Sequence, residues 1–246
     1  MSSAVVWHDL ECGRYTADLP LWLELAARHA AGDDAEILDV GAGTGRVSLA
    51  LARAGHRVTA LDLDSELLAE CGRRAAGLPL HTVTADARHF ELGDQRFALA
   101  LAPMQTVQLL GGRAGRDEFL ATTARHLRPG GVLAVALAAS ADFEEFEWHD
   151  GDPGPLPDIV ERDGTVYCSQ PTAVRRRQQS FLLERRREII DPHGGSERSE
   201  DSIALDMLSA DELQLAGREA GLTPLGVRLI AATGEHIGSE VVLLGR

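Results

Sequence analysis

The sequence contains neither lysine nor asparagine, so all 24 of its basic side chains are arginine. The absence of lysine excludes Schiff-base chemistry on the chain and the phosphate-binding lysine of P-loop proteins. Basic charge is also scarce, because 38 acidic side chains give a formal net charge of -14. A surface of this sign repels phosphate backbones, and we therefore expect no nucleic acid partner.

Cysteines and long apolar runs are few as well. Cys12, Cys71 and Cys168 are widely spaced and form no C-x-x-C pair, which predicts neither a disulfide framework nor a cysteine zinc site. No run approaches the roughly 18 apolar residues of a membrane span, and the first residues lack the pattern of a secretion signal. We expect a soluble, cytoplasmic protein with no membrane partner, present as a monomer or homodimer.

Short apolar runs alternate with helical patterns over the first 140 residues. The runs predict strands at 36–40, 57–63, 80–86, 97–102 and 132–138, and the patterns between and before them predict helices at 19–31, 46–55, 65–76 and 115–127. Strands separated by helices indicate a parallel sheet with both faces covered.

After residue 140 the pattern changes to an acidic stretch and then the Pro/Gly-rich GDPGPLP. Residues 164–190 and 197–207 are typical of antiparallel strands joined by the turn DPHGGS, although VRRRQQSFLLERRREII is also compatible with a helix. A capped helix from Ser209 then leads into two final strands. We predict a doubly wound α/β fold with a mostly parallel, seven-stranded, Rossmann-like sheet and a small antiparallel β cap inserted after strand five.

The most informative motif is a glycine turn where the first strand gives way to a helix. Its sequence, DVGAGTGR, runs from Asp39 to Arg46 and places glycines at 41, 43 and 45. Glycines allow a tight turn and a close approach of a cofactor to the backbone at the start of the next helix. The spacing G-x-G-x-G, with an acid two residues earlier, differs from the G-x-G-x-x-G of nicotinamide dinucleotide sites.

Two further acids follow the next two strands. Asp62 ends the second strand about 20 residues after the glycines, where ribose hydroxyls need a carboxylate acceptor, and Asp86 follows the third. The carboxyl ends of parallel strands meet at one edge of the sheet, so Asp39, Asp62 and Asp86 are expected to face one crevice. Either later acid alone is equally compatible with an ordinary helix cap.

The ordered motifs ILDVGAGTGR, LDLD, ADAR and LRPGG resemble those of class I S-adenosylmethionine-dependent methyltransferases. The resemblance covers about residues 13–139, and the lead-in around Tyr15 is similar to that of bacterial small-molecule members. We expect an N-terminal helical lead-in over the cofactor (1–34) and an S-adenosylmethionine-binding domain (35–139 and 209–246). Residues 140–208 are predicted to form a substrate cap, because they interrupt the fold at the ligand-binding edge of the sheet. The cofactor-binding residues that the resemblance implies are Tyr15, Gly41, Ala42, Gly43, Gly45, Asp62, Leu63, Asp86, Ala87 and Met104.

Two histidines are candidates for a catalytic base. His149 follows the acidic stretch and His236 lies between the two final strands, where the resemblance places both loops on the cofactor side. A neutral imidazole can take a proton from a hydroxyl or ammonium nucleophile, although a surface histidine is more often inert. The triplets at 175–177 and 185–187 suggest phosphate binding, but pairing with nearby acids is the expected use. No metal site is expected.

The sequence therefore predicts methyl transfer from S-adenosylmethionine to a small molecule by direct in-line displacement, in which positioning supplies most of the rate. The fourth strand ends in Pro103 and Met104, without the acid or asparagine followed by Pro-Pro and an aromatic residue that marks nucleic-acid amino methylation. The alternatives are a binding or regulatory protein that keeps the cofactor fold without transferring methyl, and a nicotinamide oxidoreductase.

Overall fold

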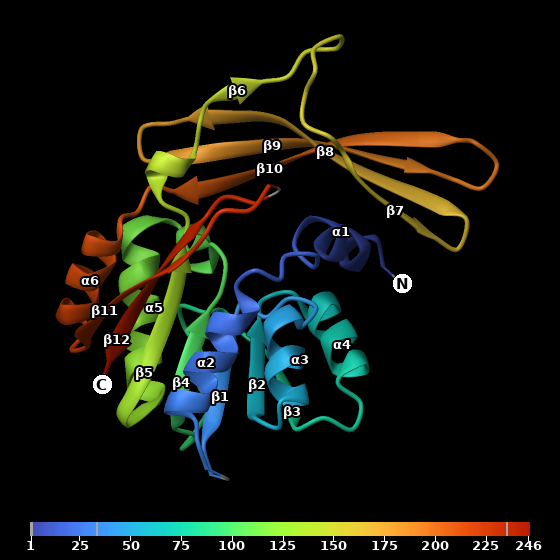
Figure 1. Cartoon of the computed structure of the whole chain (residues 1–246). Helices are drawn as coiled ribbons and strands as arrows, with labels where there is room; N and C mark the ends of the chain where they lie inside the picture. Colours follow the sequence, from blue (N-terminus) through green and yellow to red (C-terminus); the bar gives the residue numbers. More distant parts are fainter. Residues whose placement is uncertain (1, 33, 235) are drawn as a thin grey trace. The chain divides into compact units, whose positions relative to one another are not determined.

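A computed structural model describes residues 2–32, 34–234 and 236–246, and the chain divides into two compact units (Figure 1). The sheet unit comprises the residues up to Arg14 together with Ala141–Met207. The glycine-turn unit comprises Tyr15–Ser140 and Leu208–Arg246. Each unit is therefore assembled from two separate stretches of chain.

The glycine-turn unit is built on a seven-stranded sheet with the order β11-β12-β5-β4-β1-β2-β3. Strands β1 to β5 run parallel to one another, and β12 pairs antiparallel with both β5 and β11. This confirms the predicted mostly parallel Rossmann-like sheet. The strands are β1 (Glu36–Val40), β2 (Arg57–Asp62), β3 (Leu80–Thr84), β4 (Phe97–Ala102), β5 (Leu127–Leu137), β11 (Thr223–Ile230) and β12 (Ser239–Gly245).

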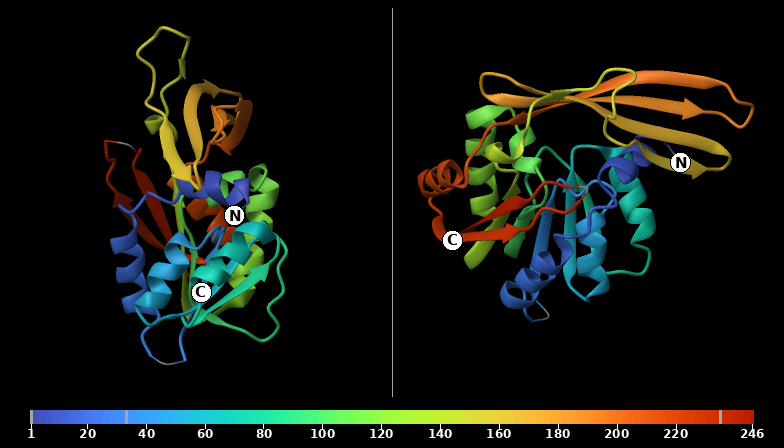
Figure 2. Two further views of the ribbon diagram at one scale, coloured as in Figure 1. Left: turned by 90° about the vertical axis from the view of Figure 1, so that its right-hand side faces the viewer. Right: turned by 45° about the horizontal axis from the view of Figure 1, so that its top comes forward.

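Helices cover both faces of this sheet (Figures 1 and 2). Buried side chains of α2 and α3 form one apolar cluster with the sheet, and those of α5 and α6 form another on the opposite face. Strand β4 is buried at every position, as expected for a central strand with helices on both sides. The helices are α2 (Leu19–His29), α3 (Arg46–Arg53), α4 (Ser65–Arg74), α5 (Gly112–His126) and α6 (Ala210–Glu219), with a 3-10 turn η1 (Thr106–Leu109).

The connection from β3 to β4 lacks a helix, and the sequence predicts none in it. Residues 85–96, which join β3 to β4, contain no helix in the structure. The segment is short and interrupted by Gly93 with φ 59°. Its apolar residues Phe90 and Leu92 pack in the cluster that includes α5 and α6 without forming a helix. Strands β1 to β4 end within two residues of their predicted ranges, whereas β5 begins five residues before the predicted 132–138.

The order of the strands creates a switch point between β1 and β4. From β1 the chain moves outward through β2 to β3, and then returns to the other side of β1 as β4. Ligands of open α/β sheets bind outside the carboxyl ends of the strands at such a point. The glycine turn follows β1 directly, so the predicted motif occupies the position that this topology favours.

The sheet unit contains a five-stranded antiparallel sheet in which β10, β9, β8 and β6 are neighbours and β7 also pairs with β8. Residues 180–190 form a strand, so the helical alternative for this region is wrong. Strand geometry sends successive arginines to opposite faces, where Arg186 lies over Trp148 and Arg187 pairs with Glu11. The strands are β6 (Phe146–Glu147), β7 (Asp158–Arg162), β8 (Thr165–Arg176), β9 (Ser180–Ile190) and β10 (Ser196–Asp206).

Helix α1 (Ser3–Glu11) packs on β7 and β8 of this sheet. Trp7 meets Tyr167 edge to face at a centroid distance of 5.2 Å. Glu11 accepts two hydrogen bonds from Arg187, at 2.8 and 2.7 Å, and one from Ser169 at 2.8 Å. Among the described residues, no helix has the length and apolar character needed to cross a membrane.

Candidate functional site

The glycine turn joins the end of β1 to the start of α3 with three glycines in left-handed backbone conformations. Gly41, Gly43 and Gly45 have φ values of 75°, 54° and 92°. A Cβ on Gly41 would lie 2.6 Å from Oγ1 of Thr106, and one on Gly45 would lie 2.6 Å from Sγ of Cys71. Both the backbone angles and the lack of space therefore require glycine.

Asp39, two residues before the first glycine, is a buried carboxylate with spare hydrogen-bonding capacity. The hydroxyl of Ser48 donates to its Oδ2 at 2.5 Å, whereas its buried Oδ1 has no hydrogen-bond partner in the described part of the chain. Burial raises the pKa of Asp39 to about 6. An unpaired buried oxygen of this kind is costly, and a cationic ammonium group would satisfy it.

Asp62 is the last residue of β2 and accepts a hydrogen bond from the glycine turn. The backbone N–H of Gly43 donates to its Oδ2 at 2.7 Å, and the N–H of Asp64 donates to its Oδ1 at 2.9 Å. A carboxylate has about four acceptor positions, so Asp62 can still accept from a diol. Leu63, the next residue, is 70% exposed, which is unusual for a leucine and provides an apolar surface beside that carboxylate.

Asp86 follows the third strand and forms an ion pair that the sequence did not reveal. Arg88 donates from Nη2 to Oδ2 at 2.6 Å and from Nε to Oδ1 at 2.9 Å, and its backbone N–H also donates to Oδ1. The Arg88 side chain is the main reason that the pKa of Asp86 falls to about 2. Asp86 therefore remains ionised with acceptor positions to spare, and Ala87 beside it is partly buried.

Met104, directly beyond β4, has φ 54°, a left-handed value that non-glycine residues rarely adopt. Such strain persists only where the surrounding structure imposes it, and it concentrates at functional sites. The partly buried side chain of Met104 packs against the apolar cluster that includes α2. Its position at the end of β4 places it on the other side of the switch point from the glycine turn.

Tyr15 and His236, predicted from distant parts of the sequence, are brought together. Their rings stack at a centroid distance of 4.8 Å, and the guanidinium of Arg46 lies 5.2 Å from the centroid of Tyr15. Tyr15 is buried, and this burial raises its pKa. His149 belongs to the sheet unit, where it is exposed with its Nδ1 3.7 Å from Oδ2 of Asp152. The catalytic roles of both histidines stay predictions.

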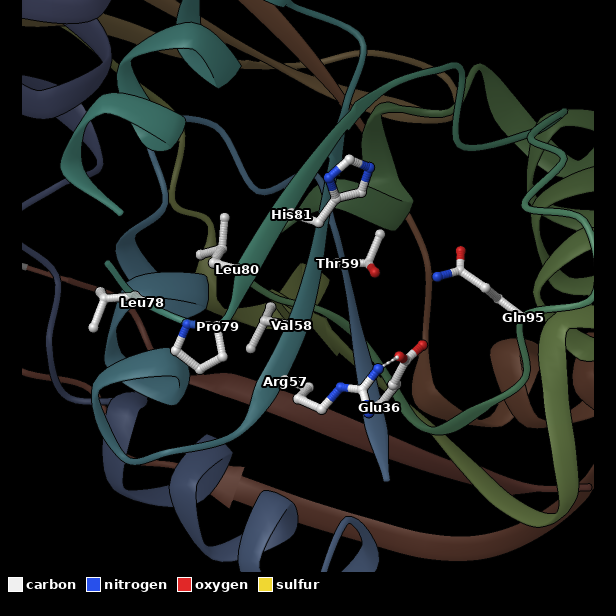
Figure 3. Close-up of a pocket in the computed structure, with 9 residues that line it drawn as sticks. All are labelled: Glu36, Arg57, Val58, Thr59, Leu78, Pro79, Leu80, His81 and Gln95. Atoms are coloured by element: carbon white, nitrogen blue, oxygen red, sulfur yellow. Dashed lines mark hydrogen bonds and ion pairs between the residues drawn. The ribbon is translucent and has the colours of Figure 1, made fainter. Parts of the chain in front are cut away.

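A hollow of about 360 Å³ lies at the opposite ends of the same strands (Figure 3). Its lining includes Glu36 and Arg57, the first residues of β1 and β2, and Leu80, the first residue of β3. The motif residues instead follow the carboxyl ends of these strands. This hollow is therefore separate from the predicted cofactor site.

The residues at the carboxyl edge fit S-adenosylmethionine by their chemistry. The turn offers close access to backbone, Asp39 offers an unpaired buried oxygen, and Asp62 with exposed Leu63 offers an acceptor beside an apolar surface. Arg46, Arg88 and Thr106 were not singled out from the sequence. The signal for Arg46 was a cation directly at the start of the helix, and Arg88 stood at the end of the ADAR motif without a role assigned to it. Nothing in the sequence marked Thr106.

Comparisons with known proteins agree with this fit. A family model for a methyltransferase domain matches residues 37–131. A cypemycin N-terminal methyltransferase from a Streptomyces species is 29% identical over 211 residues, which cover 86% of this chain and 80% of that protein. An uncharacterized protein of Mycobacterium tuberculosis is 34% identical, and there the match covers only 42% of the relative's length and 47% of this chain.

Solved structures show the same fold over nearly the whole chain. An S-adenosylmethionine-bound amino pentose methyltransferase of calicheamicin biosynthesis, from Micromonospora echinaspora, superposes with a TM-score of 0.71 at 26% identity and covers 98% of this chain and 96% of that one. A sugar N-methyltransferase from a Streptoalloteichus species superposes with a TM-score of 0.78 at 19% identity and covers 100% of this chain and 93% of that one. At this identity the similarity shows the fold alone.

The switch-point topology and the glycine turn define a Rossmann-like domain that binds a nucleoside-containing cofactor. The comparisons then identify that cofactor as S-adenosylmethionine rather than a nicotinamide dinucleotide. Residues 37–131 match a methyltransferase domain, and the chain is similar to class I S-adenosylmethionine-dependent methyltransferases.

Proposed function

We propose that this enzyme methylates an amino group of a small natural-product molecule. The observation that carries the proposal is the agreement between relatives: the sequence relative named above acts on the N-terminus of cypemycin, and the S-adenosylmethionine-bound neighbour acts on an amino pentose. The net charge of -14 also favours a cationic amine over a phosphate-rich polymer.

In the proposed site, Gly41, Ala42, Gly43 and Gly45 line the methionine part of S-adenosylmethionine, which supplies an electrophilic methyl group when bound. The unpaired Oδ1 of Asp39 is the natural acceptor for its ammonium group. Asp62 accepts from the ribose hydroxyls, and its spare acceptor positions support that role.

Three residues surround the adenine in this proposal. Leu63 packs against one face of the ring, since its side chain is otherwise exposed, and Asp86 accepts from the amino group while Ala87 supports the ring edge. Met104 lies beside the cofactor at the end of β4. Tyr15 closes over the carboxylate end.

Methyl transfer by direct displacement requires the acceptor nitrogen to lie in line with the methyl group and the sulfur, so the enzyme acts mainly by positioning. An amine that arrives as ammonium must first lose a proton. We propose His236 as the acceptor of that proton, supported by its stack on Tyr15, and His149 as the second candidate. Residues 140–208 act as the substrate cap.

The test is an incubation of the purified protein with methyl-labelled S-adenosylmethionine and a panel of amino sugars and short peptides with free N-termini. We expect a labelled product and an equal amount of S-adenosylhomocysteine from at least one amine, with none from the matching alcohol. Asp62→Ala should abolish this turnover, whereas Asp94→Ala, at an exposed acid in the β3–β4 connection, should not. Labelling of hydroxyls but not amines would reject amine methylation.

A further inference from the structure

Asp18 is a buried acid just before helix α2, and its ion-pair partner comes from a distant part of the chain. Its side chain is 1% exposed. Arg46 donates from Nη1 to Oδ1 at 2.5 Å and from Nη2 to Oδ2 at 2.7 Å, and the indole Nε1 of Trp22 donates to Oδ2 at 2.7 Å. This bidentate geometry is the strong and directional form of an arginine–carboxylate pair.

The position of Arg46 is unfavourable for the helix that it begins. It is the first residue of α3, directly after Gly45, and the first turn of α3 contains no acid. A cation at this end opposes the helix dipole, which favours negative charge at the N-terminus. The stability of α3 therefore does not explain this arginine, whereas its pairing with Asp18 does.

The same guanidinium also fixes Tyr15. Nη1 of Arg46 donates to the Tyr15 carbonyl oxygen at 2.8 Å, and the guanidinium carbon lies over the Tyr15 ring. Both the backbone and the ring of Tyr15 are thus tied to the residue that follows the glycine turn. His236 is held in turn by its stack on that ring. Tyr15 is also the first residue of the glycine-turn unit, where the chain leaves the sheet unit.

We propose that Asp18 is a positioning residue for cofactor binding, because it holds Arg46 in the orientation that places Tyr15 beside the glycine turn. This inference rests on the proposed function of that turn. Asp18 acts through Arg46 and Tyr15 and does not contact the cofactor itself. Loss of its charge leaves Arg46 without its bidentate partner and frees Tyr15 to leave the site.

The experiment measures S-adenosylhomocysteine affinity by calorimetry together with Tm for the wild type, Asp18→Asn, Arg46→Lys and the double variant. Leu25→Val is the matched control, because Leu25 is fully buried in α2 and its apolar side chain forms no hydrogen bond or ion pair. We expect each single variant to weaken binding about tenfold, since each loses a charge-assisted bidentate pair. The double variant should be no weaker than the weaker single variant, because both changes remove the same interaction.

Leu25→Val should lower Tm without changing the affinity. Amide hydrogen exchange at residues 15–19 should accelerate in the ligand-free Asp18→Asn protein and not in Leu25→Val. Wild-type affinity in Asp18→Asn, with Tm reduced as in the control, would show a purely structural role and overturn the proposal. If the wild type binds no S-adenosylhomocysteine, the proposed function fails. Accelerated exchange in Asp18→Asn would then show that the Asp18–Arg46 pair has a structural role only.

Discussion

Different forces stabilise the interior of each of the two units of this chain. All three clusters of buried apolar side chains lie in the glycine-turn unit, where β4 and most of β5 are fully buried. In the sheet unit, most positions of β8 and β9 are only half-buried, and ion pairs cross between neighbouring elements. Apolar burial tolerates salt and pH better than charge pairing does. The sheet unit should therefore be the more easily perturbed part of the molecule.

The largest effect is expected from Glu11→Gln, which breaks the charged link between α1 and β9. The Glu11 side chain is 8% exposed and that of Arg187 is 20% exposed, so the change leaves a largely buried arginine that keeps Asp201 as its one ion-pair partner among the described residues. Removing one member of such a pair costs about 3–5 kcal/mol. Hydrogen exchange resolved by segment should show faster exchange in 3–11 and 165–206, with 36–62 unchanged. Equal acceleration in both units would contradict the contrast between them.

The next effect concerns the pH dependence of the glycine-turn unit. The pKa of Asp39 is raised from 3.8 to about 6 by burial, so its contribution to stability is fully present below about pH 4 and is lost as pH rises through 6. Two pKa units correspond to about 3 kcal/mol. Asp39→Asn should remove this loss, because the amide is neutral and its oxygen still accepts from Ser48. Urea unfolding between pH 4 and 8 measures the free energy of unfolding of both proteins. Parallel plots of this free energy against pH for the variant and the wild type would refute the prediction.

A smaller effect is expected from Gly41→Ala, compared with Gly55→Ala. Both glycines have positive φ, 75° and 94°, so each substitution costs about 1–3 kcal/mol of backbone strain. Only the Cβ at 41 meets a neighbour, Thr106, whereas nothing lies within 4 Å at 55. Affinity for S-adenosylhomocysteine should fall at least about tenfold in Gly41→Ala and stay unchanged in Gly55→Ala. Equal affinities in the two variants would show that the turn at Gly41 does not contact the cofactor.

The smallest effect is expected from Glu188→Gln in the sheet unit. Its partner Arg198 is 65% exposed, and exposed pairs contribute about 0–1 kcal/mol. The change in unfolding free energy should vanish in 1 M salt, where the Debye length is about 3 Å. This variant is also the control for Glu11→Gln, because both remove a carboxylate partner of an arginine in the same sheet. A loss as large as that of Glu11→Gln would mean that exposure does not determine the strength of these pairs.

Local patterns were sufficient to predict most of the fold and the edge of the sheet that carries the site. Apolar runs and turns located the strands, and the glycines with Asp62 and Asp86 located the motif, because these signals act over a few residues. The pair of Asp18 and Arg46 lies 28 residues apart, and that of Glu11 and Arg187 lies 176 apart. With 38 acids available to 24 arginines, composition does not select such partners. The helix-free 85–96 connection agrees with the sequence, which predicts no helix there.

The interleaving of the two units has a consequence for folding on the ribosome. Strand β12 is inserted between β5 and β11, so the large sheet lacks an interior strand until residues 239–245 have been synthesised. Helix α1 is synthesised more than 150 residues before β8 and β9, the strands that it contacts. Pairings of such long sequence separation form slowly and leave apolar surface exposed in the meantime. Refolding yield should therefore fall steeply as protein concentration increases.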